Sequence, residues 1–276
     1  MRPREIPKAV LLTLGLLVGS AEGGEPPRKE VSAARAHEGG ARLRNHMDNS
    51  ALKTFQATVE RQARNFSNFF LEGKHPYNEK GESNFSLTFD DGPDDVYTPA
   101  ILDILKKYNI KATFFLVGEL AEKYPAMAKR IKDEGHAIGG HAHEHVDMRK
   151  LDTKDMYANQ VEKTRELLAR QLGFSINLFR APYGVVTDSQ IEECRKHGVV
   201  VANWSVDSFD WRKGYDNPQQ IEQVVVKHAH PGGFALFHSG RDDRSATVAA
   251  LPHIIDKLLQ RGFAFNRVDD ALDVPR

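Results

Sequence analysis

Two neighbouring carboxylates stand at the end of an apolar run in the segment TFDDGP, residues 88–93. Asp90 and Asp91 follow the strand-like letters FSLTF and precede a Gly-Pro turn. Such carboxylates can bind a metal ion, accept a proton from water, or simply belong to an Asp-Gly-Pro turn. Adjacent like charges repel each other, so a functional pair needs partners of opposite charge from elsewhere in the chain.

A group of four histidines occupies the segment HAIGGHAHEHVDM, residues 136–148. On a helix, His141 and His145 would share one face, and two imidazoles four residues apart can bind one metal ion. On a strand, His143 would share that face as well. The local structure therefore decides the ligand set. We expect His136, which precedes the strand-like AIGG, to be structural.

Three further polar clusters follow apolar runs: FRAPYG at 179–184, WSVDSFDW at 204–211 and FALFHSG at 234–240. In the first, Arg180 could keep a carboxylate ionised, and the Pro-Tyr-Gly turn could direct backbone N–H groups at an oxyanion. In the second, two tryptophans beside Asp207 and Asp210 suit a sugar-binding groove. In the third, His238 could carry a proton near neutral pH. Each cluster by itself could equally be a loop, a capping carboxylate or a structural histidine.

The elements that must position these clusters begin at residue 84, where strand-like and helical patterns alternate. The strand-like runs are FSLTF, ATFFLV, HAIGG, NLFRAP, VVVANWSV, GFALFH and GFAFNRV. The helical patterns cover 98–108, 125–135, 153–172, 187–197, 218–229 and 247–261, the first with Thr98 as its expected N-cap. This α/β alternation predicts a parallel sheet, and about seven such units predict a (β/α) barrel smaller than the eightfold form. A doubly wound open sheet is the alternative.

In such a barrel, functional side chains gather at the C-terminal ends of the strands. The clusters stand directly after strand-like runs. We therefore expect them to meet at one end of the barrel.

The first 21 of the 276 residues are typical of a signal peptide. A basic start precedes the apolar stretch AVLLTLGLLVG, and small residues near Ala21 suit cleavage. This stretch is too short to span a bilayer as a helix. We expect a protein exported to the periplasm or the medium, with no membrane span after signal cleavage. An uncleaved anchor is the alternative.

Residues 22–80 form a second part, a flexible N-terminus followed by an amphipathic helix over 50–72. We expect the helix to pack on the main domain, with a membrane-surface or partner-binding role as the alternative. The formal net charge is zero, so nothing indicates a nucleic-acid partner. The single cysteine, Cys194, leaves no internal disulfide, and nothing around it indicates a nucleophile.

Taken in order, the five clusters resemble the NodB-type polysaccharide deacetylases, carbohydrate esterase family four. The family pattern TFDDGP, H(S/T)xxH, RxPYG, DxxDW and LxH appears here as TFDDGP (88–93), HAHEH (141–145), RAPYG (180–184), DSFDW (207–211) and LFH (236–238). The resemblance covers residues 84–270. It implies a distorted (β/α) barrel of the NodB type for that domain, to which the N-terminal helix is an extension.

Site roles follow from the resemblance, position by position. It implies that Asp91, His141 and His145 bind one divalent metal. Zn²⁺ is our first expectation, and Co²⁺, Fe²⁺ or Ni²⁺ would suit the same mixed ligands. The other implied roles are the catalytic base (Asp90), its arginine partner (Arg180), an oxyanion-hole backbone N–H (Tyr183), the catalytic acid (His238), the carboxylate that tunes this acid (Asp210) and the walls of the substrate groove (Trp211 and Leu236).

Four positions depart from the family pattern. Ala142 replaces a common Ser or Thr, so a hydroxyl that steadies the metal-binding segment is missing. His143 stands where an aromatic ring is common, Gly140 replaces a common Asn, and Ser239 replaces a common Asp. These changes bear on loop rigidity, metal preference and substrate range, and none of them removes a catalytic side chain.

The implied activity is the hydrolytic removal of acetyl groups from N-acetylglucosamine in an extracytoplasmic glycan. We expect peptidoglycan first and chitin oligomers second, with acetylxylan de-esterification as the alternative on the same residues. Two other classes stay open. Two histidines and a carboxylate also form the triad of non-haem iron oxygenases, and a glycan-binding module could keep an inactive site.

Overall fold

The computed structural model describes residues 49–275. The predicted signal peptide and residues 22–48 lie outside the described residues. Among residues 49–275, no helix is both long and apolar enough to cross a membrane.

One sheet of nine strands forms the centre of the described chain. The strands are β1 (Phe69–Phe70), β2 (Ser83–Gly92), β3 (Thr113–Leu116), β4 (Ala137–Gly140), β5 (Leu178–Phe179), β6 (Val200–Ala202), β7 (Val206–Asp207), β8 (Phe234–His238) and β9 (Phe263–Phe265). Their order is β1-β6-β5-β4-β3-β2-β8-β7, with β9 paired to the start of β2, and every pair is parallel.

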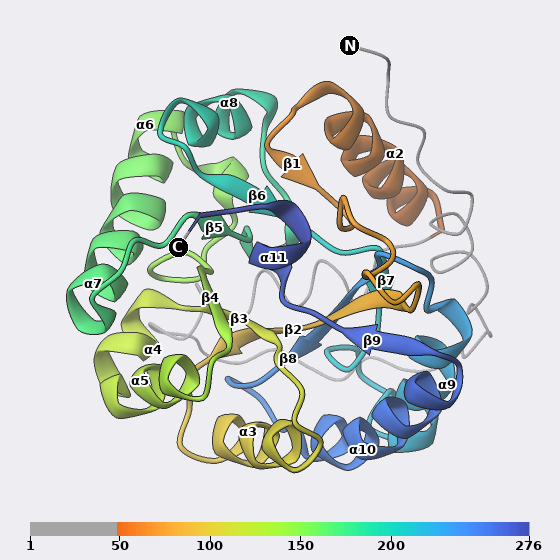
Figure 1. The fold of residues 1–276 in the computed structure, drawn as a ribbon. Helices are drawn as coiled ribbons and strands as arrows, with labels where there is room; N and C mark the ends of the chain where they lie inside the picture. Colours follow the sequence, from red (N-terminus) through yellow and green to blue (C-terminus); the bar gives the residue numbers. More distant parts are fainter. Residues whose placement is uncertain (1–48, 276) are drawn as a thin grey trace, which may run out of the picture.

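Helices surround the curled sheet, as Figure 1 shows. They are α2 (Asn49–Asn65), α3 (Tyr97–Lys107), α4 (Gly118–Lys123), α5 (Pro125–Asp133), α6 (Thr153–Asp155), α7 (Lys163–Leu172), α8 (Asp188–Lys196), α9 (Pro218–His228), α10 (Ser245–Gln260) and α11 (Val268–Leu272), together with the π-helical turn η3 (Met156–Glu162). The prediction of a distorted (β/α) barrel is confirmed. Parallel strands need crossover connections, and helices on the outside supply them.

The long strand β2 anchors the core. Its apolar residues are fully buried, and the ring of Phe89 stacks on Phe114 of β3 and Phe237 of β8 at centroid distances of 5.1 and 5.6 Å. In the β2–β8 pairing, Asp90 lies opposite His238. The hydrophobic packing of three neighbouring strands therefore brings two predicted catalytic residues to the same end of the sheet.

Two predicted elements are wrong in detail, because each apolar pattern covers two elements of the structure rather than one. The run VVVANWSV forms two strands that lie far apart in the strand order. β6 pairs with β5, and β7 pairs with β8. The helix predicted over 50–72 ends at Asn65, and Phe69–Phe70 form β1, which pairs with β6. Helix α2 packs against the barrel beside α8, where Arg61 and Gln62 bind Asp188.

The start of α3 also differs from the prediction. Val96, rather than Thr98, is the N-cap residue of this helix. Asp94, two residues earlier, accepts hydrogen bonds at its Oδ1 from the backbone N–H groups of Val96, Tyr97 and Thr98. The hydroxyl of Thr98 instead donates to the carbonyl oxygen of Ser239 at 2.9 Å. This bond ties α3 to the loop that follows β8.

Candidate active site

Asp90 and Asp91 have different nearest partners although they are adjacent. His141 approaches both, with its Nε2 3.7 Å from Asp90 Oδ2. Asp91 has a positive φ of 68°, and the pairing of β2 with β3 changes register between Phe89 and Gly92. Asp90 Oδ1 accepts a hydrogen bond from Nη1 of Arg180 at 2.9 Å. Asp91 Oδ1 lies 3.0 Å from Nε2 of His145 and 3.3 Å from Nε2 of His141. A strand that ends in an irregular turn can send neighbouring side chains to different targets.

Arg180 is fully buried at the end of β5, where each of its three side-chain nitrogens has at least one acceptor. Its Nε donates to the carbonyl oxygen of Ala202, its Nη1 to Thr88 Oγ1 as well as to Asp90, and its Nη2 to the carbonyl oxygen of Asn203. The face of its guanidinium lies 4.1 Å from the centroid of the Phe115 ring. Because a buried charge needs such partners, Arg180 is held rigidly against Asp90.

Asp91, His141 and His145 bring one ligand atom each to within 4.8 Å of one another. Asp91 Oδ1 is buried and has no hydrogen-bond partner, although it lies between the two imidazoles. Burial alone would raise the pKa of Asp91, but His145 and His141 outweigh it and hold the pKa well below its ordinary range. One ionised carboxylate and two imidazoles form the ligand set of a catalytic metal site with open positions.

Nδ1 of His141 donates to the carbonyl oxygen of Arg180 at 2.8 Å. A carbonyl can only accept, so this bond places a hydrogen on Nδ1 and leaves Nε2, which faces Asp91 Oδ1, as the nitrogen that could bind a metal. Burial lowers the pKa of His145, which favours the neutral imidazole that a metal requires. The three residues therefore fit a divalent metal on the chemistry of their donors.

The segment 141–145, called the metal loop below, is neither a helix nor a strand. Ala142 and His145 have positive φ angles of 64° and 52°. This backbone directs His143 away from the other two histidines and against Gly118, where a Cβ atom would come within 2.3 Å of His143 Nδ1. The alternative in which all three histidines share a strand face is therefore not the one adopted.

His136 lies at the opposite end of β4 from the metal loop. Its Nδ1 accepts a hydrogen bond from the backbone N–H of Ala112, and its ring packs edge-on against Phe114. The structure thus places His136 in the packing between β3 and β4, in line with the expected structural role.

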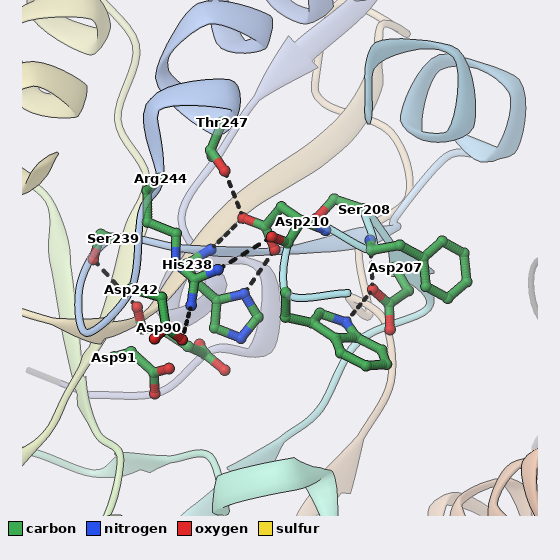
Figure 2. A network of polar contacts seen from close by, with 12 residues as sticks. Asp90, Asp91, Asp207, Ser208, Asp210, His238, Ser239, Asp242, Arg244 and Thr247 are labelled. Carbon is green, nitrogen blue, oxygen red and sulfur yellow. Dashed lines mark hydrogen bonds and ion pairs between the residues drawn. The ribbon is translucent and has the colours of Figure 1, made fainter. Parts of the chain in front are cut away.

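His238 and Asp210 form a buried pair at the end of β8. Nδ1 of His238 lies 2.7 Å from Asp210 Oδ1, and Asp210 Oδ2 accepts from the His238 backbone N–H and the Thr247 hydroxyl at 2.9 and 2.8 Å. Figure 2 shows the Asp210 carboxylate between Thr247 and His238, with Asp90 and Asp91 nearby. Burial alone would lower the pKa of His238, but Asp210 outweighs it and raises the pKa above its ordinary value. An imidazole whose pKa is raised by a buried carboxylate suits a general acid.

Residues 77–202 match the family model "Polysaccharide deacetylase". The chain is 42% identical over 191 residues to the peptidoglycan-N-acetylglucosamine deacetylase of Bacillus cereus, covering 69% of this chain and 67% of the relative. The chain belongs to the polysaccharide deacetylase family.

Two further deacetylases are similar to this chain, one in sequence and one in both sequence and structure. The peptidoglycan-N-acetylmuramic acid deacetylase PdaA of Bacillus subtilis is 31% identical over 252 residues, which cover 91% of this chain and 90% of PdaA. The crystal structure of a peptidoglycan N-acetylglucosamine deacetylase in complex with 4-naphthalen-1-yl-N-oxidanyl-benzamide superposes with a TM-score of 0.69 at 39% identity, covering 74% of this chain and 92% of the other. The resemblance to the NodB-type hydrolases of carbohydrate esterase family four is confirmed.

The remaining predicted site residues of the deacetylase lie around the same end of the sheet. Tyr183 adopts φ 62° and ψ 4°, and its ring packs edge-on against His145 at a centroid distance of 5.0 Å. The indole N–H of half-buried Trp211 donates to Asp207 Oδ1 at 3.0 Å. Leu236 is fully buried within β8. The oxyanion-hole role of Tyr183 and the groove roles of Trp211 and Leu236 stay predictions.

Several residues that support the deacetylase site were not predicted. Thr88 accepts a hydrogen bond from the Arg180 guanidinium. Thr247 donates to the carboxylate of Asp210, and Arg244 donates to its carbonyl oxygen. Ser239, which departs from the family pattern, donates to the carbonyl oxygen of Asp90 through its backbone N–H at 2.8 Å and its hydroxyl at 3.3 Å. Only the alternation along β2 could have indicated Thr88, because it shares a strand face with Asp90.

Proposed function

We propose that this deacetylase hydrolyses the N-acetyl group of N-acetylglucosamine residues in peptidoglycan, with a divalent metal, Zn²⁺ first, bound by Asp91, His141 and His145. The observation that carries the proposal is the separation of the two adjacent carboxylates. Asp91 lies against two imidazoles and Asp90 against a buried guanidinium. One carboxylate is thus available as a ligand and the other as a base. The named substrates of the relatives support peptidoglycan as the glycan.

An amide is a poor electrophile with a poor leaving group, so hydrolysis needs help at both ends. A Zn²⁺ ion bound by the triad would polarise the acetamide carbonyl and lower the pKa of a water molecule. Asp90 would accept the proton of the attacking water. Arg180 orients Asp90 through the hydrogen bond from Nη1 to Oδ1.

The departing amine would receive its proton from His238. Asp210 holds Nδ1 of this imidazole, so Nε2 is the nitrogen available to the substrate. Asp210 raises the pKa of His238 above its ordinary value, which favours the protonated form that an acid requires. Products would be acetate and a glucosamine residue with a free amino group. The backbone N–H of Tyr183 would add a donor for the oxyanion of the tetrahedral intermediate.

Mass spectrometry across a panel of acetylated glycans tests the reaction and the substrate together. The full chain, supplied with Zn²⁺ or Co²⁺, is incubated with peptidoglycan, chitin oligomers and acetylxylan. We expect release of acetate from peptidoglycan, with the mass of each glycan fragment falling by ~42 mass units for every acetyl group replaced by hydrogen. Preference for chitin oligomers or acetylxylan would replace the proposed substrate, and turnover that depends on oxygen would indicate an iron oxygenase. Glycan binding without acetate release would overturn the proposed catalysis.

We also propose that the chain is exported, on the basis of its signal-like residues 1–21. N-terminal sequencing of the protein recovered from the producing cells should find a new end near residue 22. Recovery of an uncleaved chain in the cytoplasm would contradict export.

A further inference from the structure

The metal loop is held by a residue that no motif contains. Gln160 lies in the π-helical turn η3 and is only 4% exposed. Its Oε1 accepts hydrogen bonds from the backbone N–H groups of His143 and Glu144, both at 3.0 Å. Its Nε2 lies 3.3 Å from Glu144 Oε2 and donates to it. One side chain therefore satisfies two consecutive backbone donors between the ligands His141 and His145.

The other side of the metal loop is held by the first turn of α4. The backbone N–H groups of Gly118 and Glu119 donate to the carbonyl oxygens of Ala142 and His143, each at 3.0 Å. Gly118 is required at this point because a Cβ atom would collide with His143. The loop is thus bound from opposite sides, by helix N–H groups on its carbonyls and by Gln160 on its N–H groups.

This double attachment matters because the loop backbone is strained. Ala142 and His145 both have positive φ, a conformation that side-chain-bearing residues adopt only where surrounding contacts enforce it. Ala142 carries no hydroxyl that could supply a hydrogen bond from within the loop. Without Gln160, the buried N–H group of His143 and the partly buried N–H group of Glu144 would lose their acceptor beside a ligand imidazole.

Gln160 lies in an irregular stretch between two helices. η3 interrupts the run from α6 to α7 with i to i+5 bonding, so that the Lys163 N–H donates to the carbonyl oxygen of Ala158. The carbonyl oxygen of Gln160 accepts a hydrogen bond from the Thr164 hydroxyl at 2.9 Å. π-helical turns are found frequently at functional sites.

We propose that Gln160 is a positioning residue of the metal site, which sets the direction of the His145 imidazole through the backbone of the metal loop. This inference rests on the proposed function, since it takes the triad to be a metal site. Gln160 acts on the ligands through the N–H groups of His143 and Glu144, in the way that outer hydrogen bonds orient metal ligands.

Calorimetric titration of the metal-free full chain with Zn²⁺ tests the proposal. Gln160→Met keeps the size of the side chain and removes the acceptor. We expect its dissociation constant for Zn²⁺ to rise about 10- to 100-fold. Saturating Zn²⁺ should restore most of its kcat, because no catalytic group is altered. Gln62→Met is the matched control, since the buried Gln62 donates hydrogen bonds to the carbonyl oxygen of Val186 and to Asp188, outside both the metal loop and α4. It should bind Zn²⁺ like the wild type.

A second variant guards against a loss of folding. The double variant Gln160→Glu/Glu144→Gln exchanges the amide and the carboxylate. The new carboxylate at position 160 can accept from both backbone N–H groups, and the new amide at position 144 can donate to it. We expect this double variant to recover Zn²⁺ affinity to within about threefold of the wild type. Amide hydrogen exchange of His143 and Glu144 in the wild type needs no variant, and both amides should exchange slowly.

The outcomes separate the two proposals. Wild-type Zn²⁺ affinity in Gln160→Met, or fast exchange of both amides, would overturn the role of Gln160 and leave the proposed function intact. A wild-type chain that binds no Zn²⁺, Co²⁺, Fe²⁺ or Ni²⁺ would overturn the metal site itself, and the role of Gln160 with it.

Discussion

His141 and Arg180 share a hydrogen bond of 2.8 Å, from Nδ1 of the histidine to the carbonyl oxygen of the arginine. The guanidinium of the same Arg180 binds Asp90 at 2.9 Å. One fully buried residue therefore orients a metal ligand with its backbone and the proposed base with its side chain. The two functions of the site are coupled at this point, so variants must separate them by changing one side chain at a time.

Asp90→Asn should separate the base from the ligand. The amide keeps the shape of the side chain but cannot accept a proton, so we expect kcat to fall by about 10²- to 10⁴-fold. Zn²⁺ affinity, measured by calorimetry, should stay close to the wild-type value because Asp91 supplies the carboxylate ligand. Asp91→Asn is the matched control and should lose the metal. If Asp90→Asn lost the metal instead, the assignment of the two carboxylates would be reversed.

Asp210→Asn should move the pH profile of the reaction. A general acid works only while it is protonated, so activity is lost as pH rises through the pKa of His238. Asp210 raises this pKa against the effect of burial. Removing its charge should lower the pKa, and the alkaline limb of kcat against pH should shift to lower pH as kcat falls.

Thr247→Val is the control for this shift. It removes one hydrogen bond to Asp210 Oδ2 and keeps the carboxylate charge. We expect a smaller loss of kcat and an alkaline limb near that of the wild type. An unchanged limb in Asp210→Asn would contradict the role of His238 as the acid.

His136→Asn should reduce the sensitivity of folding to acid. Burial, aided by Lys111, lowers the pKa of His136 from 6.5 to about 4. Between these values the unfolded chain binds a proton that the native chain does not, so stability falls as pH drops from 6.5 towards 4. Urea unfolding at pH 7 and pH 4.5 should show that wild type loses about 2 kcal/mol more than the variant. Asn can retain an acceptor for the Ala112 N–H, and equal losses would refute the prediction.

Cys194 should be chemically inert in the folded chain. The thiol is fully buried in α8, and burial raises its pKa to about 12. Since the thiolate is the reactive form, iodoacetamide at pH 8 should label the native protein very slowly and the urea-unfolded protein at one site. Mass spectrometry counts the adducts. Rapid native labelling would show that α8 opens or that the thiol is accessible.

The common location of the chemical clusters could be predicted from the sequence, because each cluster directly follows a strand-like run. Parallel strands place their C-terminal ends together, so Asp90, His141, Arg180 and His238 had to meet at one end of the sheet. The pattern of apolar residues was sufficient to locate the strands and helices, since each element must bury apolar side chains and so carries its own short-range pattern. The π-helical turn, by contrast, lies within a pattern that predicted one continuous helix over 153–172.

The amino-acid sequence by itself determined the alternation of strands and helices and the chemical groups at the strand ends, because both follow from short-range patterns. Only the tertiary structure decided which histidines turn towards Asp91, since the metal loop follows neither the 3.6-residue nor the two-residue period. Its backbone is held by N–H groups of α4 and by Gln160, which contact it from separate elements. The separation of β6 from β7 has the same cause, because neighbouring strands, rather than local propensity, set their positions.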